Sequence, residues 1–189
     1  MVSVVVVFWM FVILFGVIGA MRGWAKELLV SFSIILALFI ITLIGKFAGD
    51  FIPPLVRPVS ITVDPAVLRA LKIAFWVRAA IIAVVGYFGY QTAIVQRFVK
   101  SERLVRAGLQ DLLLGLFLGL VNGFLIMGTL LYFLHETNFL ISNLISQPTG
   151  DAYTAMERLW VFLPPRWLGE PGIYIAVALA FIFVLVVFI

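Results

Sequence analysis

The sequence predicts an all-α integral membrane protein, a multi-pass helical bundle with four core transmembrane helices and a fifth helix at its C-terminal end. Composition is the first observation: 65% of the 189 residues are apolar and 12% are charged. Soluble domains carry about 45–50% apolar and about 25% charged residues, so this composition excludes a soluble enzyme. The second observation is that the apolar residues form continuous runs, whereas the strands of a membrane barrel alternate. The mean hydropathy of +1.23 agrees with both.

Five apolar runs supply the expected spans. A transmembrane helix needs about 20 predominantly apolar residues to cross the hydrocarbon layer. The expected spans cover residues 2–21, 28–45, 73–95, 112–134 and 172–189. No basic residue precedes the first run, which is also longer than the apolar core of a signal peptide, so we expect it to be retained. We therefore divide the chain into a four-helix membrane domain over 1–135, an interfacial loop over 136–171 and the fifth span over 172–189.

Lysine and arginine are concentrated in two connections between the runs. The connection 22–27 holds two of them and the connection 96–111 holds four. The positive-inside rule places both connections inside and the N-terminus outside. In the second connection the basic residues surround an apolar helical face, which predicts a helix lying on anionic lipid headgroups. These basic residues are Arg97, Lys100, Arg103 and Arg106. The small net charge of +4 favours the lipid bilayer over nucleic acid as the partner.

Glycines at regular spacing indicate that the fourth run packs against another helix. Gly115, Gly119 and Gly123 follow one another at i, i+4 and i+8 and so form one groove. Lipid tails supply no hydrophobic drive for helix association, and small residues let two helix backbones come close instead. Gly19 and Gly23, at the end of the first run, repeat the spacing. The pattern leaves three roles open: packing inside the monomer, a homo-oligomer interface and a pore lining.

Two polar residues lie inside the expected spans. Asn122 is about 15 Å from the start of the fourth span at 1.5 Å per residue, so its amide needs a partner near the bilayer centre. Asn122 either forms a hydrogen bond to another helix or lines part of a substrate path. Arg78 lies in the third span and either extends to the headgroups or leans inward toward Asn122 or Gln91.

A tight charged cluster occupies the short connection after the first span. Arg22 and Glu27 lie there with Trp24 between them. One interpretation is a positively charged membrane boundary anchored by the indole ring. In the other, Glu27 pairs with a basic residue of the 96–111 connection and docks the two connections together. Asp111 ends that second connection, one helical step before the glycine stripe.

Catalytic and metal-binding signatures give no support for an enzyme. The chain has no cysteine and a single histidine, His135. His135-Glu136 begins an H-E-x-x-H zinc pattern, but Phe139 stands where the second histidine would be. We therefore expect no enzymatic activity, no cofactor and no metal site, and we interpret His135 as an interfacial residue.

Two segments resemble a known family. Arg22-Gly23-Trp24-Ala25-Lys26-Glu27 resembles the R-G-aromatic-x-basic-E signature after the first helix of the colicin V production protein (CvpA) family. The segment from Asp111 to Gly123 resembles that family's D-x-x-x-G-x-x-x-G-x-x-R-G pattern, with Asn122 in place of the usual arginine. The similarity covers about residues 1–135.

The resemblance implies a multi-pass protein of the bacterial inner membrane, where the outside position that the basic connections predict for the N-terminus is the periplasm. It implies a role in colicin V production and export and in envelope homeostasis, in a family for which no enzymatic reaction is established. Our own hypothesis is that the chain acts by helix-mediated assembly or partner binding. The expected partners are other membrane proteins or further copies of the chain. The alternative is a small transporter or channel subunit with a polar path through Arg78, Gln91 and Asn122.

Overall fold

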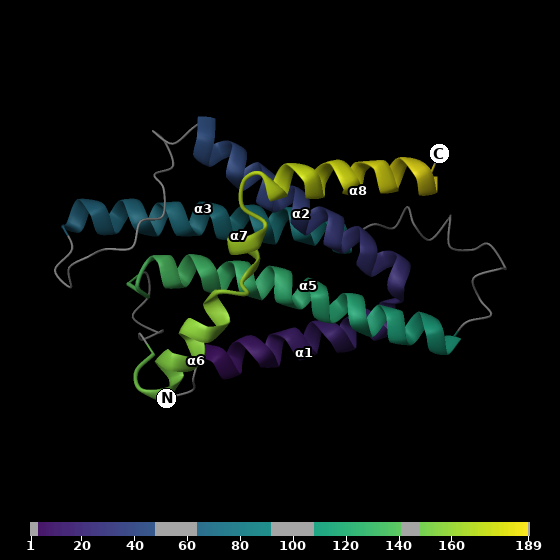
Figure 1. The fold of residues 1–189 in the computed structure, drawn as a ribbon, viewed down its shortest axis with the longest axis horizontal. Coiled ribbons are helices and arrows are strands. Elements are labelled where there is room, and N and C mark those ends of the chain that lie inside the picture. Colours follow the sequence, from purple (N-terminus) through teal and green to yellow (C-terminus); the bar gives the residue numbers. More distant parts are fainter. Residues whose placement is uncertain (1–3, 48–63, 92–107, 141–147, 189) are drawn as a thin grey trace.

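In the computed structural model, residues 4–47, 64–91, 108–140 and 148–188 are described. Every regular element in these ranges is a helix (Figure 1), so the predicted all-α fold class is confirmed for the described part of the chain. The helices are α1 (Val4–Arg22), α2 (Trp24–Phe47), α3 (Pro65–Tyr90), α5 (Gly108–Glu136), α6 (Asp151–Trp160), α7 (Pro164–Trp167) and α8 (Gly172–Phe188).

Three of these helices, α1, α2 and α5, are long and apolar enough to cross a membrane. The α6–α7 segment and α8 form a pair bent by 59°, which adds a fourth candidate when it is counted as one span. The expected span 73–95 coincides with α3 as far as residue 90, but α3 is not among the three candidates. Residues 92–95 of that expected span lie outside the described residues.

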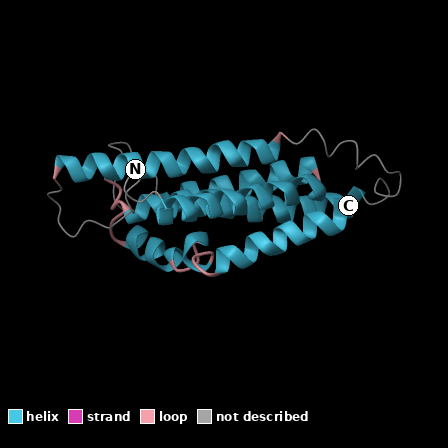
Figure 2. Ribbon diagram, turned by 90° about the horizontal axis from the view of Figure 1, so that it is seen from above, coloured by secondary structure: helices cyan, strands magenta, loops and turns pink. Residues whose placement is uncertain are grey.

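The helices pack around α5 and α2. Helix α1 lies antiparallel to α5, because Gly19 meets Gly115 while Val12 meets Gly123. Helix α2 packs against both α5 and α3, and α8 packs on α2 through the ring pairs Phe32–Phe183 and Phe39–Tyr174. In Figure 2, α3 and α8 lie on opposite sides of the bundle with the other long helices between them.

The start of α3 shows how the sequence sets a helix boundary. Asp64 is the N-cap, and its carboxylate accepts a hydrogen bond from the backbone N–H of Ala66 at 2.7 Å. Pro65 occupies the first helical position, where its missing N–H costs nothing and its fixed φ suits a helix. Together these two residues set the start of α3, whose other end packs against α2 where Gly89 meets Ser33.

The segment 136–171, expected to be an interfacial loop, instead contains α6 and α7. Helix α6 is amphipathic and buries Met156. Helix α7 begins with Pro164, whose Cδ would be 2.8 Å from a methyl group at Gly128, so the bare backbone of α5 allows this approach. The prolines predicted breaks in this segment, but a ten-residue helix fits between them.

Candidate functional site

The turn between α1 and α2 consists of one residue, Gly23. Its φ is +86°, a left-handed conformation that glycine adopts without the steric cost of a Cβ atom. Its N–H donates to the carbonyl of Gly19 at 2.9 Å. A methyl group at Gly23 would also lie 2.8 Å from both carboxylate oxygens of Asp111. Glycine is therefore required here for two separate reasons.

Asp111, at the start of α5, holds the first turn of α2. Its Oδ1 accepts a hydrogen bond from the backbone N–H of Trp24 at 3.1 Å. The first N–H groups of a helix lack partners within the helix and carry the positive end of its dipole, so a carboxylate stabilises this position. The sequence indicated Asp111 as a functional polar residue, and the structure gives it this capping role between two helices far apart in the sequence.

Arg22 connects three helices. Its Nη1 lies 2.7 Å from Glu27 Oε1 in an ion pair, and its Nη2 donates to the carbonyl of Tyr90 at 2.9 Å. The guanidinium also lies over the Tyr90 ring, 4.3 Å from its centroid, a cation–π contact. The Glu27 side chain is 0% exposed, and that of Arg22 is 21% exposed. This pair therefore ties the end of α1 to α2 and α3.

Asn122 completes the cluster from α5. Its Nδ2 donates to Glu27 Oε2 at 2.8 Å and to the Glu27 carbonyl at 2.9 Å. Its Oδ1 accepts from the hydroxyl of Ser31 at 2.6 Å. Asn122 is 0% exposed, and a buried amide is tolerated only when both its donors and its acceptor are satisfied. We call Arg22, Glu27, Ser31, Tyr90 and Asn122 the polar cluster.

The partners of Glu27 bear on the expectation that it docks against the 96–111 connection. Among the described residues its side chain pairs with Arg22 and Asn122. The basic residues expected to dock against it or to contact headgroups, Arg97, Lys100, Arg103 and Arg106, lie outside the described residues.

The predicted glycines lie where α1 and α5 come closest. A methyl group at Gly119 would lie 2.9 Å from the Cα of Gly19, and one at Gly123 would lie 3.0 Å from the Cα of Val12. Methyl groups at Gly19 and Gly115 would touch the backbone carbonyl of the opposite glycine. The stripe is therefore covered by α1 of the same chain, at near-contact of two backbones.

Arg78 and Gln91 lie apart from Asn122, so Arg78 does not adopt the inward-leaning one of the two arrangements considered for it. Gly89 of α3 lies against Ser33 of α2, and Arg78 is eleven residues earlier, about 16 Å along the helix at 1.5 Å per residue. Arg78 is 7% exposed, and its Nη1 donates to the carbonyl of Ala74 at 2.8 Å. Gln91 is the exposed C-cap of α3. The Asn122 amide forms its hydrogen bonds with Glu27 and Ser31 instead.

Sequence reasoning missed two members of the polar cluster. Ser31 follows Glu27 by four residues and so shares its helix face, a spacing that could have indicated a joint role. Tyr90 carried no comparable signal, because its partner Arg22 is 68 residues away. The hydroxyl of Tyr90 is buried and has no hydrogen-bond partner in the part of the chain that is described.

The opposite end of α5 carries His135, which is 1% exposed and therefore buried within the protein. Its Nε2 lies 3.2 Å from Oε1 of Glu157 on α6, and the centroid of its ring lies 5.2 Å from the ring centroid of Trp160. Nδ1 has no partner among the described residues. The described residues contain no group of three or more His, Cys, Asp or Glu side chains suited to a metal ion.

Long apolar helices held together around a buried carboxylate and a buried amide define an all-α membrane protein. The chain belongs to the colicin V production protein family, because its sequence matches that family over residues 5–149, which is most of its length. The match includes α1 from its second residue, α2, α3, α5 and every residue of the polar cluster, whereas α6, α7 and α8 lie beyond it. Comparison with curated proteins and with solved structures gave no match.

Proposed function

We propose that this chain is a non-enzymatic factor of the bacterial inner membrane that supports colicin V production and export and envelope homeostasis. It acts by holding a rigid helical surface against other membrane proteins. In this proposal the N-terminus is periplasmic, four helices form the core, and α8 is a fifth span. Family membership supports the biological context.

The observation that carries the assembly mechanism is the pairing of Glu27 with Arg22 and Asn122 inside the polar cluster. Both carboxylate oxygens of Glu27 accept from groups of the chain itself, one from Arg22 and one from Asn122. A buried charge without such partners would cost several kcal/mol. Because the partners come from α1 and α5, the cluster fixes the relative positions of the helices. It supports a joint between helices more than a site with free ligand-binding capacity.

The alternative, a polar path for transport, requires Arg78, Gln91 and Asn122 to line one route. Arg78 lies about 16 Å along the helix direction from the level of the cluster at 1.5 Å per residue, and Gln91 caps the exposed end of α3. Nothing in the arrangement of the described residues favours that route, and assembly is the stronger proposal.

Export of colicin V from cells that lack the chain and are complemented with variants tests the proposal. Glu27→Gln removes the charge that Arg22 needs and keeps the shape, so we expect reduced export. Lys26→Gln removes the neighbouring charge, which is partly exposed, and should leave export unchanged. Chain abundance in the membrane, measured in parallel, separates loss of the protein from loss of its action.

A photo-crosslinking residue at Leu14, exposed on α1, should capture another membrane protein in exporting cells. Three results together would overturn the assembly proposal in favour of transport. They are equal export with Glu27→Gln and Lys26→Gln, the absence of a crosslinked partner, and solute flux in proteoliposomes.

A further inference from the structure

The last membrane segment of the chain is interrupted between α7 and α8. The α6–α7 segment and α8 are bent by 59° at this break, which consists of residues 168–171. Helix α7 packs along α5, because Pro164 lies against Gly128 and Leu168 is buried in one cluster with Leu125. The break therefore begins beside the middle of α5 and not at its end.

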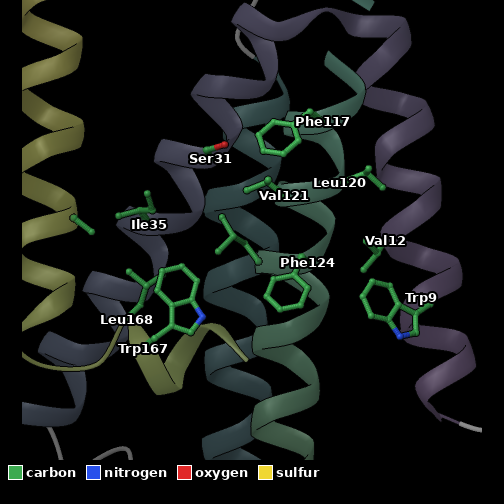
Figure 3. A pocket seen from close by; sticks show the side chains of 12 residues that line it. Trp9, Val12, Ser31, Ile35, Phe117, Leu120, Val121, Phe124, Trp167 and Leu168 are labelled. Atoms are coloured by element: carbon green, nitrogen blue, oxygen red, sulfur yellow. The ribbon is translucent and has the colours of Figure 1, made fainter. Parts of the chain in front are cut away.

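The break lies in the outer half of the hydrocarbon layer. The length of the fourth span places Asn122 near the bilayer centre, about 15 Å from the start of that span. Leu168 lines the same apolar pocket as Phe124 and Leu125 (Figure 3), which lie within about 5 Å of Asn122 along α5. Glu170 follows Leu168 by two residues, at most about 7 Å of chain. Glu170 is therefore no more than about 12 Å from the centre, within the roughly 15 Å of hydrocarbon in half a bilayer.

The break carries an exposed ion pair. The Nζ of Lys46, in the last turn of α2, lies 3.6 Å from Oε1 of Glu170, and the two side chains are 53% and 45% exposed. The hydroxyl of Tyr174 donates to the same carboxylate oxygen. Pro171 is exposed as well. Charged side chains and non-helical backbone at this depth are not found against lipid tails, so they are covered by protein or reached by water.

Two observations favour water over a partner helix. Both charges are already paired within the chain, so a partner would remove an ion pair from water and gain none, which at best breaks even. Lys46 also stands one residue beyond the expected span 28–45, at the outer border of the membrane. Because its side chain extends from that border to Glu170, water has a polar route to the same carboxylate.

We propose that the break between α7 and α8 forms a water-filled recess in the outer half of the bilayer, held open by Lys46 and Glu170. The recess is closed at its inner end. No residue that lines the adjoining apolar pocket is charged, and its one aliphatic hydroxyl, that of Ser31, already donates to Asn122. The recess thins the hydrocarbon layer on one side without forming a path across it. This inference rests on the proposal that α8 is a fifth span and not on colicin V export.

Single cysteines test the recess, because the chain has none of its own. Gly172→Cys keeps the ion pair and places a thiol at the first residue of α8. Val6→Cys is the matched control, since Val6 is 58% exposed on α1 and lies about 9 Å outward from Val12, which meets Gly123. A membrane-impermeant maleimide reacts with the thiolate, which needs water to form. In spheroplasts we expect labelling of Gly172→Cys to be at least about tenfold faster than that of Val6→Cys.

A third position defines the outer side of the membrane. Asp151→Cys, exposed on α6, should react at the full rate from the same side as Gly172→Cys, and labelling in SDS reports the amount of each chain. Glu170→Cys repeats the measurement should Gly172→Cys not accumulate in the membrane. Fast labelling of both Gly172→Cys and Val6→Cys would place the membrane border below both residues. Slow labelling of both would show that the break is covered, and either result overturns the recess.

Two further variants separate the recess from the span on which it depends. Leu179 is 61% exposed and about 10 Å farther along α8 than Gly172, so Leu179→Cys should react as slowly as Val6→Cys. Fast labelling of Leu179→Cys would show that α8 does not span the bilayer, and the span and the recess would fail together. Lys46→Leu combined with Glu170→Leu should slow labelling of Gly172→Cys to the rate of Val6→Cys. An unchanged rate would overturn the role of the ion pair.

Discussion

At the Gly23 end of α5, the helices are joined by a buried ion pair, a saturated amide and two backbones in near-contact. At the His135 end, α6 and α7 are joined to α5 by rings. Tyr132 and Trp160 are stacked with an interplanar angle of 2°, and Arg166 lies over Trp160. At the Gly23 end, each polar group is stable in the interior only while its partners are present. At the His135 end, each ring contact contributes to stability separately. We therefore expect single changes to be costly at the Gly23 end and mild at the His135 end.

The largest effect should follow from Glu27→Ala. It leaves Arg22 without its carboxylate and removes one of the two acceptors of the Asn122 amide. Breaking a buried ion pair by removing one partner costs about 3–5 kcal/mol. The free energy of unfolding, measured by titrating SDS into mixed micelles, checks this. Lys26→Ala is the control, with an expected change below about 0.5 kcal/mol. A similar loss in both variants would contradict the special role of the cluster.

The second effect concerns the glycine contact. Gly119→Ala places a methyl group 2.9 Å from the Cα of Gly19, and overpacking of this kind costs about 1–3 kcal/mol. Gly45→Ala on α2 is the matched control, because no atom lies within 4 Å of the added group. At that position alanine should stabilise the helix by about 0.5–1 kcal/mol, because glycine loses more conformational entropy on folding than alanine does. The same unfolding titration should therefore show changes of opposite sign, and equal signs would rule out close packing at Gly119.

His135→Phe examines the other end. The new ring keeps the contacts with Trp160 and Phe139 and removes the buried Nδ1 that lacks a partner. Glu157, with its side chain 35% exposed, retains access to water. Because removing an unsatisfied polar group offsets the lost hydrogen bond, the unfolding free energy should change by less than about 1 kcal/mol. A loss as large as that of Glu27→Ala would show that the two ends are held alike.

Arg166→Gln should have the smallest effect on stability. It removes an exposed cation–π contact with Trp160, a contact worth about 0.5 kcal/mol at such sites. Unfolding of this variant should therefore be close to that of the wild type. A loss of several kcal/mol would place Arg166 among the residues that hold the His135 end together.

Much of this comparison was predictable from local sequence. The apolar runs predicted α1, α2, α5 and α8, because a membrane-spanning helix is recognised from the length of its apolar run alone. The spacing of Gly115, Gly119 and Gly123 predicted one groove on α5, because a helix fixes which residues share a face. The family resemblance identified from Arg22 to Glu27 and from Asp111 to Gly123 is confirmed by the family match.

The remainder depended on distances across the fold. Asn122 needed a partner, but its sequence position could not distinguish Glu27, 95 residues away, from Arg78. The cap of Asp111 on Trp24 likewise joins positions 87 residues apart. Helix α6 lies between prolines in a segment without a long apolar run, so composition indicated a loop. Packing against α1 and against Tyr132 and His135 of α5 stabilises a helix there.

The one-residue turn at Gly23 also has a consequence for how the protein is made. With no spacer between α1 and α2, we expect the two helices to enter the bilayer together as a helical hairpin. Arg22 and Glu27 lie on either side of its tip and neutralise each other as it forms. A tag or a few added residues after Gly23 would separate these charges and move Trp24 off Asp111, so the tip of this hairpin should tolerate no insertion.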